Sequence, residues 1–397
     1  MKRKWRRVAG LGAGIALVGA TAFLAAGCGG GGGNAETRTT VSGLPQSIGK
    51  GEGALNLIEW PYYSDPAFAK PFEQQTGCKI KRKDAGSSNQ MVALMRTGGG
   101  GGGGEYDMVS ASGDASLRLI AGGDVRPVNV DLIPSWKDFL PILQSPPHNT
   151  VGGVHYGVSL QWGPNVLLYD PNKITPSPKT WSPIYDAKYK GQISIPNNPI
   201  QIADAALYLS STKPDLGIKD PYELTQKQFD ATIDLLKQQK PLVKLYWVYD
   251  TDARSAFANG DVSLAAAWPV DTLNLQKKDV PVGETTPAKV TGWADTWMIA
   301  KRAPHPNCAY LWMKYVSTPK VQAQQALIFG ETPANPKACP IMNQMEAGSC
   351  SRYHLDEPDA YYNSIKFWKT PVADCGNGEK NCIDYNEWQK AWTQITG

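Results

Sequence analysis

The chain has 397 residues, of which 42% are hydrophobic and 19% are charged. A chain of this length predicts two domains with apolar cores of substantial size. The formal net charge is +4, and it becomes −1 when the five basic residues within the first seven positions are removed. This balance argues against a nucleic-acid partner, whereas the 13 tryptophans favour an exported protein with an aromatic-lined binding surface.

The N-terminal residues have the parts of a secretory signal. Residues 1–27 combine a basic start, an apolar run and small residues at the end. The sequence Leu-Ala-Ala-Gly-Cys at 24–28 resembles a bacterial lipobox, in which Cys28 becomes the lipidated N-terminus. Residues 28–53 predict a flexible tether. We expect an exported protein that a lipid holds at the outer face of the bacterial cell membrane or in the periplasm, with no spanning helix in the mature chain.

The cysteines that follow the tether are even in number, which predicts disulfides in an exported chain. They are Cys78, Cys308, Cys339, Cys350, Cys375 and Cys382. Their spacing is not that of a metal site, and we expect no metal and no cofactor. The sequence does not fix the connectivity. Short loops favour Cys339 with Cys350 and Cys375 with Cys382, which leaves Cys78 with Cys308.

The first half of the folded part alternates strands with helices. We expect strands at 54–60, 78–82 and 106–110 and helices at 67–76 and 88–97. This alternation predicts a parallel sheet with ligands beyond the carboxyl ends of its strands. Loops at those ends carry Trp60, Tyr63, Ser112 and Asp114. The seven glycines at 98–104 lack the Lys-Ser/Thr of a phosphate-binding loop and predict a flexible solvent loop.

The second half predicts a second α/β lobe and a return to the first. Residues 154–169 predict a strand that crosses over, followed by a helix and a buried strand that ends at Asn197 and Asn198. Later helices are expected at 199–210, 224–239, 252–259, 306–316, 319–328, 359–367 and 386–393, and a strand at 262–268. We therefore assign 54–160 and 291–335 to lobe 1, and 161–290 and 336–397 to lobe 2.

The stretch at 291–300 carries the sharpest sign of a binding site. It reads as a glycine bend followed by an apolar, β-prone run that contains Trp293 and Asp295. Residues i and i+2 of a strand point the same way. A π surface and a carboxylate on one face suit a cation with some apolar body. A core tryptophan beside a turn aspartate is the simpler interpretation, so the prediction depends on what else converges here.

Short motifs in this chain occur in the order seen in the spermidine/putrescine-binding family of ABC importers. They are Trp-Pro-Tyr-Tyr at 60–63, Gly-Val-Ser at 157–159, Trp-Gly at 162–163, Thr-Trp at 180–181, Tyr-Lys-Gly at 189–191, Ala-Ala-Ala-Trp at 265–268, Trp-Ala-Asp at 293–295 and Gly-Glu-Thr-Pro at 330–333. The chain resembles that family over residues 55–333. The resemblance implies an α/β, two-lobed periplasmic-binding-protein-like fold of type II, with the ligand cleft between the lobes.

The resemblance also implies a set of ligand-binding residues. They would be Trp60, Tyr63, Trp268, Trp293 and Asp295, with Ser112 nearby. Two departures from the family change the expected charge of the site. Asn198 and Gln201 stand where the family has acidic residues, and Asp114 stands where it often has a tyrosine. Asp114 and Asp271 are candidate replacements, and otherwise the ligand carries one positive charge or is neutral or zwitterionic.

Other functions stay open at this point. A quaternary amine or an amino-acid-like zwitterion could be the solute. Ferric iron is a further alternative because of the adjacent Tyr361 and Tyr362. An exported carboxylate-dependent hydrolase is less favoured, since the histidines lie outside any catalytic motif. We expect a binding protein and not an enzyme.

The family implies a mechanism of capture and delivery. The lobes would close over a small amine by hinges near residues 160–165 and 289–293, and the closed form would dock on the permease subunits of an ABC transporter. We expect a monomer in this role.

Overall fold

The computed structural model describes residues 43–100, 104–375 and 381–397 of the chain. The predicted signal peptide, Cys28 and the first part of the tether lie outside these residues. None of the helices in the described ranges combines the length and the apolar character needed to cross a membrane.

The first lobe is built on a sheet with the strand order β13-β6-β12-β3-β1-β2, and β14 also pairs with β12. Strands β1, β2 and β3 are parallel to one another, and β12 is antiparallel to both β3 and β6. The bounds are Ala54–Glu59 (β1), Lys79–Asp84 (β2), Met108–Ala111 (β3), Gly157–Pro164 (β6), Val290–Ile299 (β12), Thr332–Pro333 (β13) and Ile365–Phe367 (β14). A two-stranded hairpin joins β4 (Thr150–Val151) to β5 (Val154–His155).

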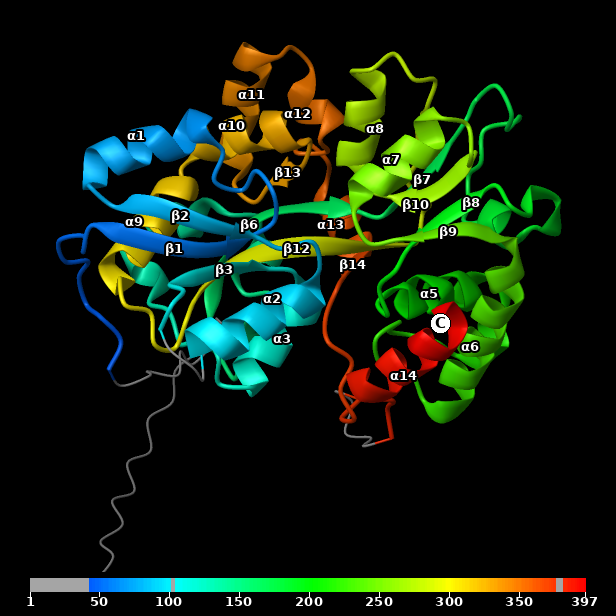
Figure 1. Ribbon diagram of the computed structural model, residues 1–397, viewed down its shortest axis with the longest axis horizontal. Coiled ribbons are helices and arrows are strands. Elements are labelled where there is room, and N and C mark those ends of the chain that lie inside the picture. The colour runs from blue at the N-terminus through cyan, green and yellow to red at the C-terminus, as the bar shows by residue number, and fades with distance from the viewer. Residues whose placement is uncertain (1–42, 101–103, 376–380) are drawn as a thin grey trace, which may run out of the picture. The chain divides into compact units, whose positions relative to one another are not determined.

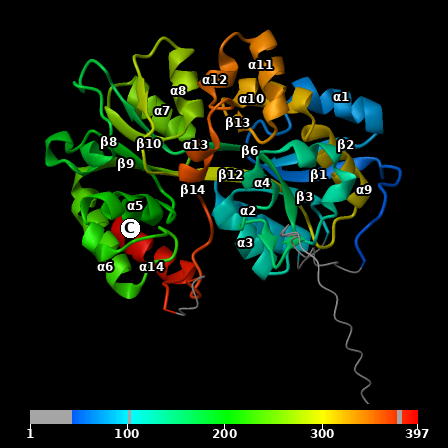
Figure 2. The ribbon, with the colours of Figure 1, turned by 180° about the vertical axis from the view of Figure 1, so that it is seen from behind.

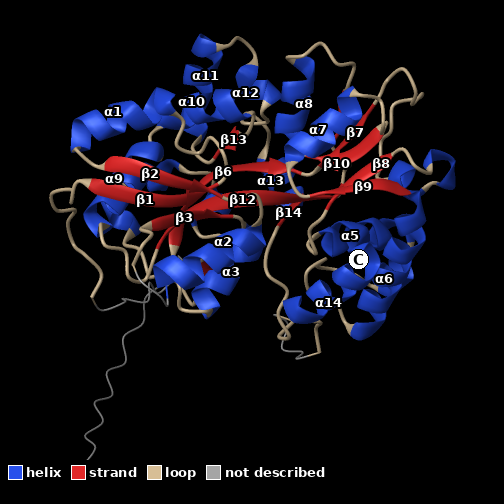
Figure 3. Ribbon diagram, viewed as in Figure 1, coloured by secondary structure: helices blue, strands red, loops and turns tan. Residues whose placement is uncertain are grey.

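The second lobe is built on a sheet of five strands in the order β11-β7-β10-β8-β9. Figure 3 shows the two sheets with helices above and below each. The strands are Val166–Tyr169 (β7), Ile193–Pro196 (β8), Val243–Trp247 (β9), Leu264–Ala267 (β10) and Gly283–Thr285 (β11). Strands β8, β9 and β10 run parallel and are fed by helices, so their carboxyl ends meet at one edge.

Helices cover both sheets (Figure 1). Those around the first sheet are Pro66–Thr76 (α1), Ser88–Leu94 (α2), Gly113–Ala121 (α3), Pro141–Gln144 (α4), Pro306–Val316 (α9), Pro319–Phe329 (α10), Cys339–Met345 (α11) and Ser349–Arg352 (α12). Those around the second are Gln201–Thr212 (α5), Gln226–Gln239 (α6), Asp250–Ala258 (α7), Pro269–Gln276 (α8) and Tyr385–Thr396 (α14), while α13 (Asp359–Ser364) precedes β14. Short 3-10 helices lie at Val130–Leu132, Pro134–Asp138, Ser182–Tyr185, Ala187–Tyr189, Pro214–Leu216, Lys240–Leu242 and Pro336–Ala338.

The chain passes between the lobes three times. Strand β6 runs into β7 with only Asn165 between them, and β12 returns from the side of β11. The third crossing follows β14 and leads to α14. In the view from behind, α13 lies where the two sheets meet, beside β14 of the first sheet (Figure 2). These crossings include the two segments that we expect to act as hinges.

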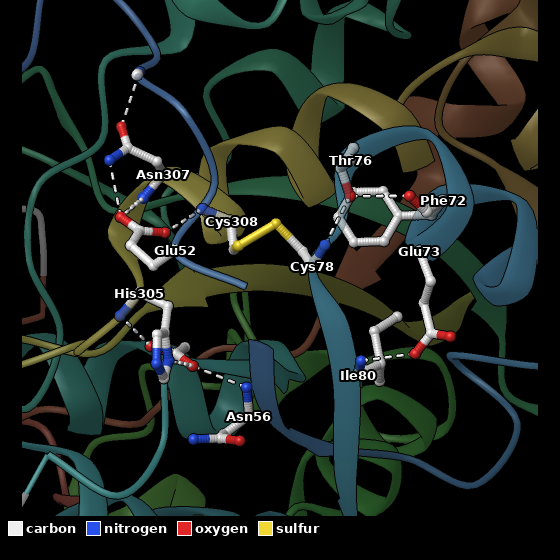
Figure 4. The surroundings of a disulfide bond; sticks show 12 residues. Glu52, Asn56, Phe72, Glu73, Thr76, Cys78, Ile80, His305, Asn307 and Cys308 are labelled. Carbon is white, nitrogen blue, oxygen red and sulfur yellow. Dashed lines mark hydrogen bonds and ion pairs between the residues drawn. A yellow bond between two sulfur atoms is a disulfide. The ribbon is translucent and has the colours of Figure 1, made fainter. Parts of the chain in front are cut away.

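A disulfide joins the start of β2, the edge strand of the first sheet, to α9. Cys78, just before β2, is joined to Cys308 of α9 across 230 residues of sequence. Beside it, Glu52 accepts hydrogen bonds from the backbone N–H groups of Asn307 and Cys308, both at 2.9 Å (Figure 4). The other disulfides are Cys339–Cys350 and Cys375–Cys382. This is the pairing that the short loops favour.

Several local predictions were wrong. The glycine bend expected at the start of 291–300 is absent, because Thr291 and Gly292 are paired residues within β12. Residues 359–367 do not form one helix, because α13 ends at Ser364 and Ile365–Phe367 pairs with β12 as a parallel strand. The glycine run does not begin as a loop either. A π-helical turn over Met95–Gly100 continues α2 into its first glycines, and residues 101–103 lie outside the described part.

The segment 336–355 packs on the first lobe. A core cluster joins Ala323 and Ala326 of α10 to Met342 of α11 and to Cys350 of α12. Helix α14, in contrast, contacts α6 of the second lobe. We therefore propose a division in which 336–355 belong to lobe 1 and only the last helix and its neighbours belong to lobe 2.

Candidate ligand-binding cleft

A cavity of about 490 Å³ opens between the lobes, at the carboxyl ends of their strands. Its lining from lobe 1 includes Trp60, Tyr62, Tyr63, Asp65, Gly86, Ser112, Trp293, Asp295, Phe329 and Glu331. Its lining from lobe 2 includes Asn197, Asn198, Trp247, Tyr249, Asp250, Arg254 and Trp268, and Trp368 comes from the third crossing. A volume of this size suits a small organic molecule.

Asp295 is the centre of an acidic end of the cavity. Its Oδ1 accepts a hydrogen bond from the Ser112 hydroxyl at 2.5 Å, and its Oδ2 contacts the Tyr63 hydroxyl. The same Tyr63 hydroxyl lies 3.2 Å from Oε2 of Glu331. Two carboxyl groups from β12 and from the segment after α10 therefore meet at one phenol.

The local structure of β12 directs Trp293 and Asp295 into this cavity. The pairing of β12 with β6 shifts register between Ala294 and Thr296, so that two residues of β6, Leu160 and Gln161, lie opposite the single residue Asp295. Trp293 pairs with Gly163, and a Cβ on that glycine would lie 2.6 Å from the Trp293 ring. The missing side chain of Gly163 thus makes room for the indole. Both residues line the cavity, as their spacing predicts.

Burial raises the pKa values of all three groups at the acidic end. The pKa of Asp295 rises to about 7 because the carboxyl is buried, although hydrogen bonds from Ser112 and Tyr63 oppose the rise. Burial, together with the charge of Asp295, raises the pKa of Glu331 well above its usual value. The pKa of Tyr63 rises well above 10 through burial and then through both carboxylates. Deprotonation of the pair is therefore costly unless a cation arrives.

Tryptophans form the opposite wall. The rings of Trp247 and Trp268 meet edge to face, with centroids 5.0 Å apart and an interplanar angle of 86°. Trp368 stands edge-on to Trp268 at 6.5 Å. Such faces can cover methylene groups and can attract a cation.

One basic residue lines the cavity beside this wall. Nη1 of Arg254 contacts Asp250 at 2.5 Å and Asp271 at 2.8 Å. Asp250 lines the cavity with Arg254, whereas Asp271 is buried behind it. Asp271 also accepts a hydrogen bond from the backbone N–H of Trp268 at 3.1 Å, which caps α8.

Three of the predicted site residues do not reach the cavity. Asp114 is fully buried in the first turn of α3 and accepts a 2.8 Å hydrogen bond from Ser88. Asp271 is held by α8 and Arg254, and Gln201 is buried in the first turn of α5. A helix N-terminus supplies local partners that compete with the cavity for such side chains. Asn198 does line the cavity, and it is also a hydrogen-bond partner that lowers the pKa of Asp114 against the larger effect of burial.

Several residues that line the cavity are not among the predicted site residues. Glu331 stood within the Gly-Glu-Thr-Pro motif and was not recognised as a site residue. Trp247 ends β9, a strand that the sequence pattern does not predict. Trp368 follows β14, which lies in a segment predicted as a helix. Correct strand assignments would have placed both tryptophans at strand ends, where ligand residues are expected.

The iron alternative has no support in the cleft. Tyr361 stacks on His354 with centroids 5.1 Å apart, and the Tyr362 hydroxyl donates to the His354 carbonyl oxygen at 3.1 Å. Neither tyrosine lines the cavity. Among the described residues, no three His, Cys, Asp or Glu side chains gather as they would around a metal ion.

Two α/β lobes joined by several crossings, with a polar and aromatic cavity between them, define a two-lobed solute-binding protein. The chain belongs to the bacterial extracellular solute-binding protein family, whose model matches residues 67–347. Members of this family bind solutes for transport, so the chain is a binding protein and not an enzyme.

Characterised relatives and solved structures agree with this class. The chain is 23% identical over 309 residues to the putrescine/agmatine-binding protein of Pseudomonas aeruginosa, covering 73% of this chain and 81% of that protein. It is 21% identical over 306 residues to the putrescine-binding periplasmic protein PotF of Escherichia coli, covering 73% and 80%. The structure of the spermidine/putrescine substrate-binding protein PotD of Streptococcus pneumoniae superposes with a TM-score of 0.68 at 16% identity, over 86% of this chain and 98% of that one.

Proposed function

We propose that this chain captures a small organic cation, a polyamine or a related amine, in the cleft and delivers it to the permease of an ABC transporter. The single observation that carries the proposal is the buried Asp295 carboxyl, which faces an aromatic cavity with Trp293 beside it. A charge-assisted hydrogen bond to an ammonium group, with indole faces along its methylenes, selects amines without any catalytic group.

The charge of the lining supports a cationic ligand. Among the residues that the structure describes, four carboxyl residues line the cavity, namely Asp65, Asp250, Asp295 and Glu331, against one basic residue, Arg254. The relatives named above bind putrescine, agmatine or spermidine by their descriptions, which places amines first among the candidates.

The end of the cavity that lobe 2 forms, away from Asp295, determines which kind of amine fits best. Asn198 lines it in place of an acidic residue, and Arg254 lies there with Asp250. Asp250 can accept a second ammonium group, which favours a diamine. Arg254 can instead pair with a carboxylate, which favours an amino-acid-like zwitterion as the second candidate.

Capture requires that both lobes touch the ligand, because a ligand closes two lobes only by binding the closed form more tightly. The lining comes from both lobes. We propose that the closed form docks on the permease, and that a lipid on Cys28 keeps the protein, as a monomer, near the membrane.

Isothermal titration calorimetry of residues 43–397 tests the proposal with putrescine, agmatine, spermidine, choline and 4-aminobutyrate. At least one amine should bind, and Asp295→Asn should weaken it by roughly 10- to 150-fold, since hydrogen bonds to charged groups contribute about 1.5–3 kcal/mol. Glu284→Gln is the matched control. The Glu284 carboxyl accepts a hydrogen bond from the Thr272 hydroxyl and does not line the cavity. Equal affinities of the wild-type protein and Asp295→Asn would remove Asp295 from the site, and no binding by any of these compounds would overturn the proposal.

A further inference from the structure

At the acidic end of the cleft, two carboxyl groups lie within hydrogen-bond distance of one hydroxyl group, which has only one hydrogen to donate. Tyr63 contributes a single hydroxyl hydrogen, and carboxyl oxygens of both Asp295 and Glu331 lie around its oxygen. If Tyr63 donates to Asp295, its oxygen can only accept at Glu331. The 3.2 Å contact is then a hydrogen bond only when Glu331 itself carries a proton.

The surroundings favour that proton. Asp295 and Glu331 are 2% and 3% exposed. The groups that face them are Tyr63 from the loop after β1, Ser112 at the start of α3, and the more distant carboxyl of Asp114. Within the described part of the chain, no cationic side chain is among the groups that shift either carboxyl's pKa. Two negative charges on one phenol would therefore lie buried and uncompensated.

We propose that Asp295 and Glu331 form a two-carboxyl seat that holds a proton while it is empty and releases it when the cationic head of the ligand binds. The proposal rests on the proposed function and assigns Glu331 as a second binding carboxyl. The exchange balances, because one positive charge enters as the ligand and one leaves as a proton to solvent. Both carboxylates then face an ammonium or a guanidinium group, whose several donors replace the shared hydrogen.

The proposal fixes a pH dependence. The empty seat binds one more proton than the occupied seat, so the association constant must rise with pH while that proton is still bound. The logarithm of the constant should rise by about one per pH unit for one released proton. Burial raises the pKa of Asp295 to about 7 and that of Glu331 well above its usual value, so the empty pair of carboxyl groups still holds a proton near neutral pH. A seat that is already ionised would give an affinity independent of pH over the same range.

Proton release can be measured directly with a pH-indicator dye in unbuffered solution at pH 8, which avoids amine buffers that could compete for the cleft. Putrescine and agmatine are the probes. We expect about one proton per bound ligand for the wild-type protein. Glu331→Gln keeps a hydrogen-bond donor for Tyr63 but no titratable proton, so its release should fall close to zero. Glu284→Gln, which alters a carboxyl outside the cavity, should still release the proton.

The outcomes separate the two proposals. Binding in calorimetry without proton release from the wild-type protein would overturn the two-carboxyl seat and leave the amine-binding function intact. Release that persists in Glu331→Gln would overturn the role of Glu331. Absence of binding by both probes and the other amines would overturn the function itself. If Glu331→Gln fails to fold, the affinity of the wild-type protein measured between pH 6.5 and 8.5 tests the two-carboxyl seat instead. An affinity that does not change with pH over this range would contradict it.

Discussion

Asp114, Asp271 and Asp295 all belong to strands or to the residues that follow them, yet only Asp295 lines the cavity. The difference lies in their partners. The Asp114 carboxyl accepts a hydrogen bond from Ser88. The Asp271 carboxyl pairs with Arg254 and accepts a hydrogen bond from a backbone N–H at the N-terminus of α8. Asp295 lies within β12, and its oxygens bind the hydroxyl groups of Ser112 and Tyr63, which line the cavity themselves.

Replacing Asp114 with asparagine tests this distinction. The change should leave amine affinity within about threefold of the wild-type value, because an amide oxygen still accepts from Ser88 and the carboxyl does not reach the cavity. Calorimetry beside Asp295→Asn makes the comparison. A loss of affinity as large as that of Asp295→Asn would mean that the charge of Asp114 does act on the ligand.

The sequence reveals a site residue when its signal is local. The i and i+2 spacing of Trp293 and Asp295 predicts a shared face, and the aromatic loop after the first strand brings Trp60 and Tyr63. Glu331 has no such signal, because it reaches the cavity only once α10 packs beside the first sheet. Trp368 depends likewise on the pairing of β14 with β12, two strands far apart in sequence.

Among the elements, α9 shows how a helix is fixed to the sheet by charge and by a covalent bond. Glu52 accepts from the backbone N–H groups of Asn307 and Cys308 in the first turn, where the helix dipole favours a negative charge. Burial alone would raise the pKa of Glu52, but these backbone hydrogen bonds outweigh it and the pKa is lowered from 4.5. Cys308, in this same turn, also forms the disulfide with Cys78.

Glu52→Gln should therefore lower stability in a pH-dependent way. A group whose folded pKa is depressed stabilises the fold above its unfolded pKa, and this contribution is lost as pH falls through the folded value. We expect a melting temperature about 1–2 °C lower at pH 7, from roughly 0.3–1 kcal/mol of charge–dipole energy. The difference should shrink below about pH 4.

Thermal unfolding from pH 3 to 7 measures this difference. Glu105→Gln is the control, since Glu105 lies in the loop before β3 and not at a helix N-terminus. A difference between Glu52→Gln and the wild-type protein that stays constant down to pH 3 would show that charge is not the cause.

The alternation of elements is predictable from the sequence, but the short elements are not. Strands β1 and β10 and helices α1, α6 and α9 follow local apolar patterns and stops, and the structure contains them. Strand β14 has three residues and exists only through its ladder with β12. Tertiary pairing decides the structure of such a segment, which is why a single helix over 359–367 was the wrong prediction.

At the scale of the whole molecule, the two lobes touch at the mouth of the cleft. Tyr249, between β9 and α7, lies against Gly86, just after β2, and a Cβ on that glycine would be 2.1 Å from the tyrosine ring. On another side, the Arg118 guanidinium of α3 lies 4.7 Å from the centroid of the Tyr385 ring of α14. These contacts join residues of different lobes.

Gly86→Ala should weaken ligand binding without touching the ligand seat. The new methyl group must push Tyr249 away or hold the lobes apart, and overpacking of this kind costs about 1–3 kcal/mol in the closed form. The open form does not bear this cost. We expect an amine affinity roughly tenfold lower and a melting temperature of the ligand-free protein that changes little, both measurable by calorimetry.

The double mutant decides whether the contact is the cause. In a Tyr249→Ala background the added methyl has no ring to meet, so Gly86→Ala should then have almost no further effect on affinity, giving a coupling between the two changes. Additive effects would mean that Gly86 acts locally, for example through its backbone hydrogen bond to Gln90 at 2.8 Å. Coupling would instead show that the mouth contact stabilises the closed form, because residues from different lobes can depend on each other only while the lobes meet.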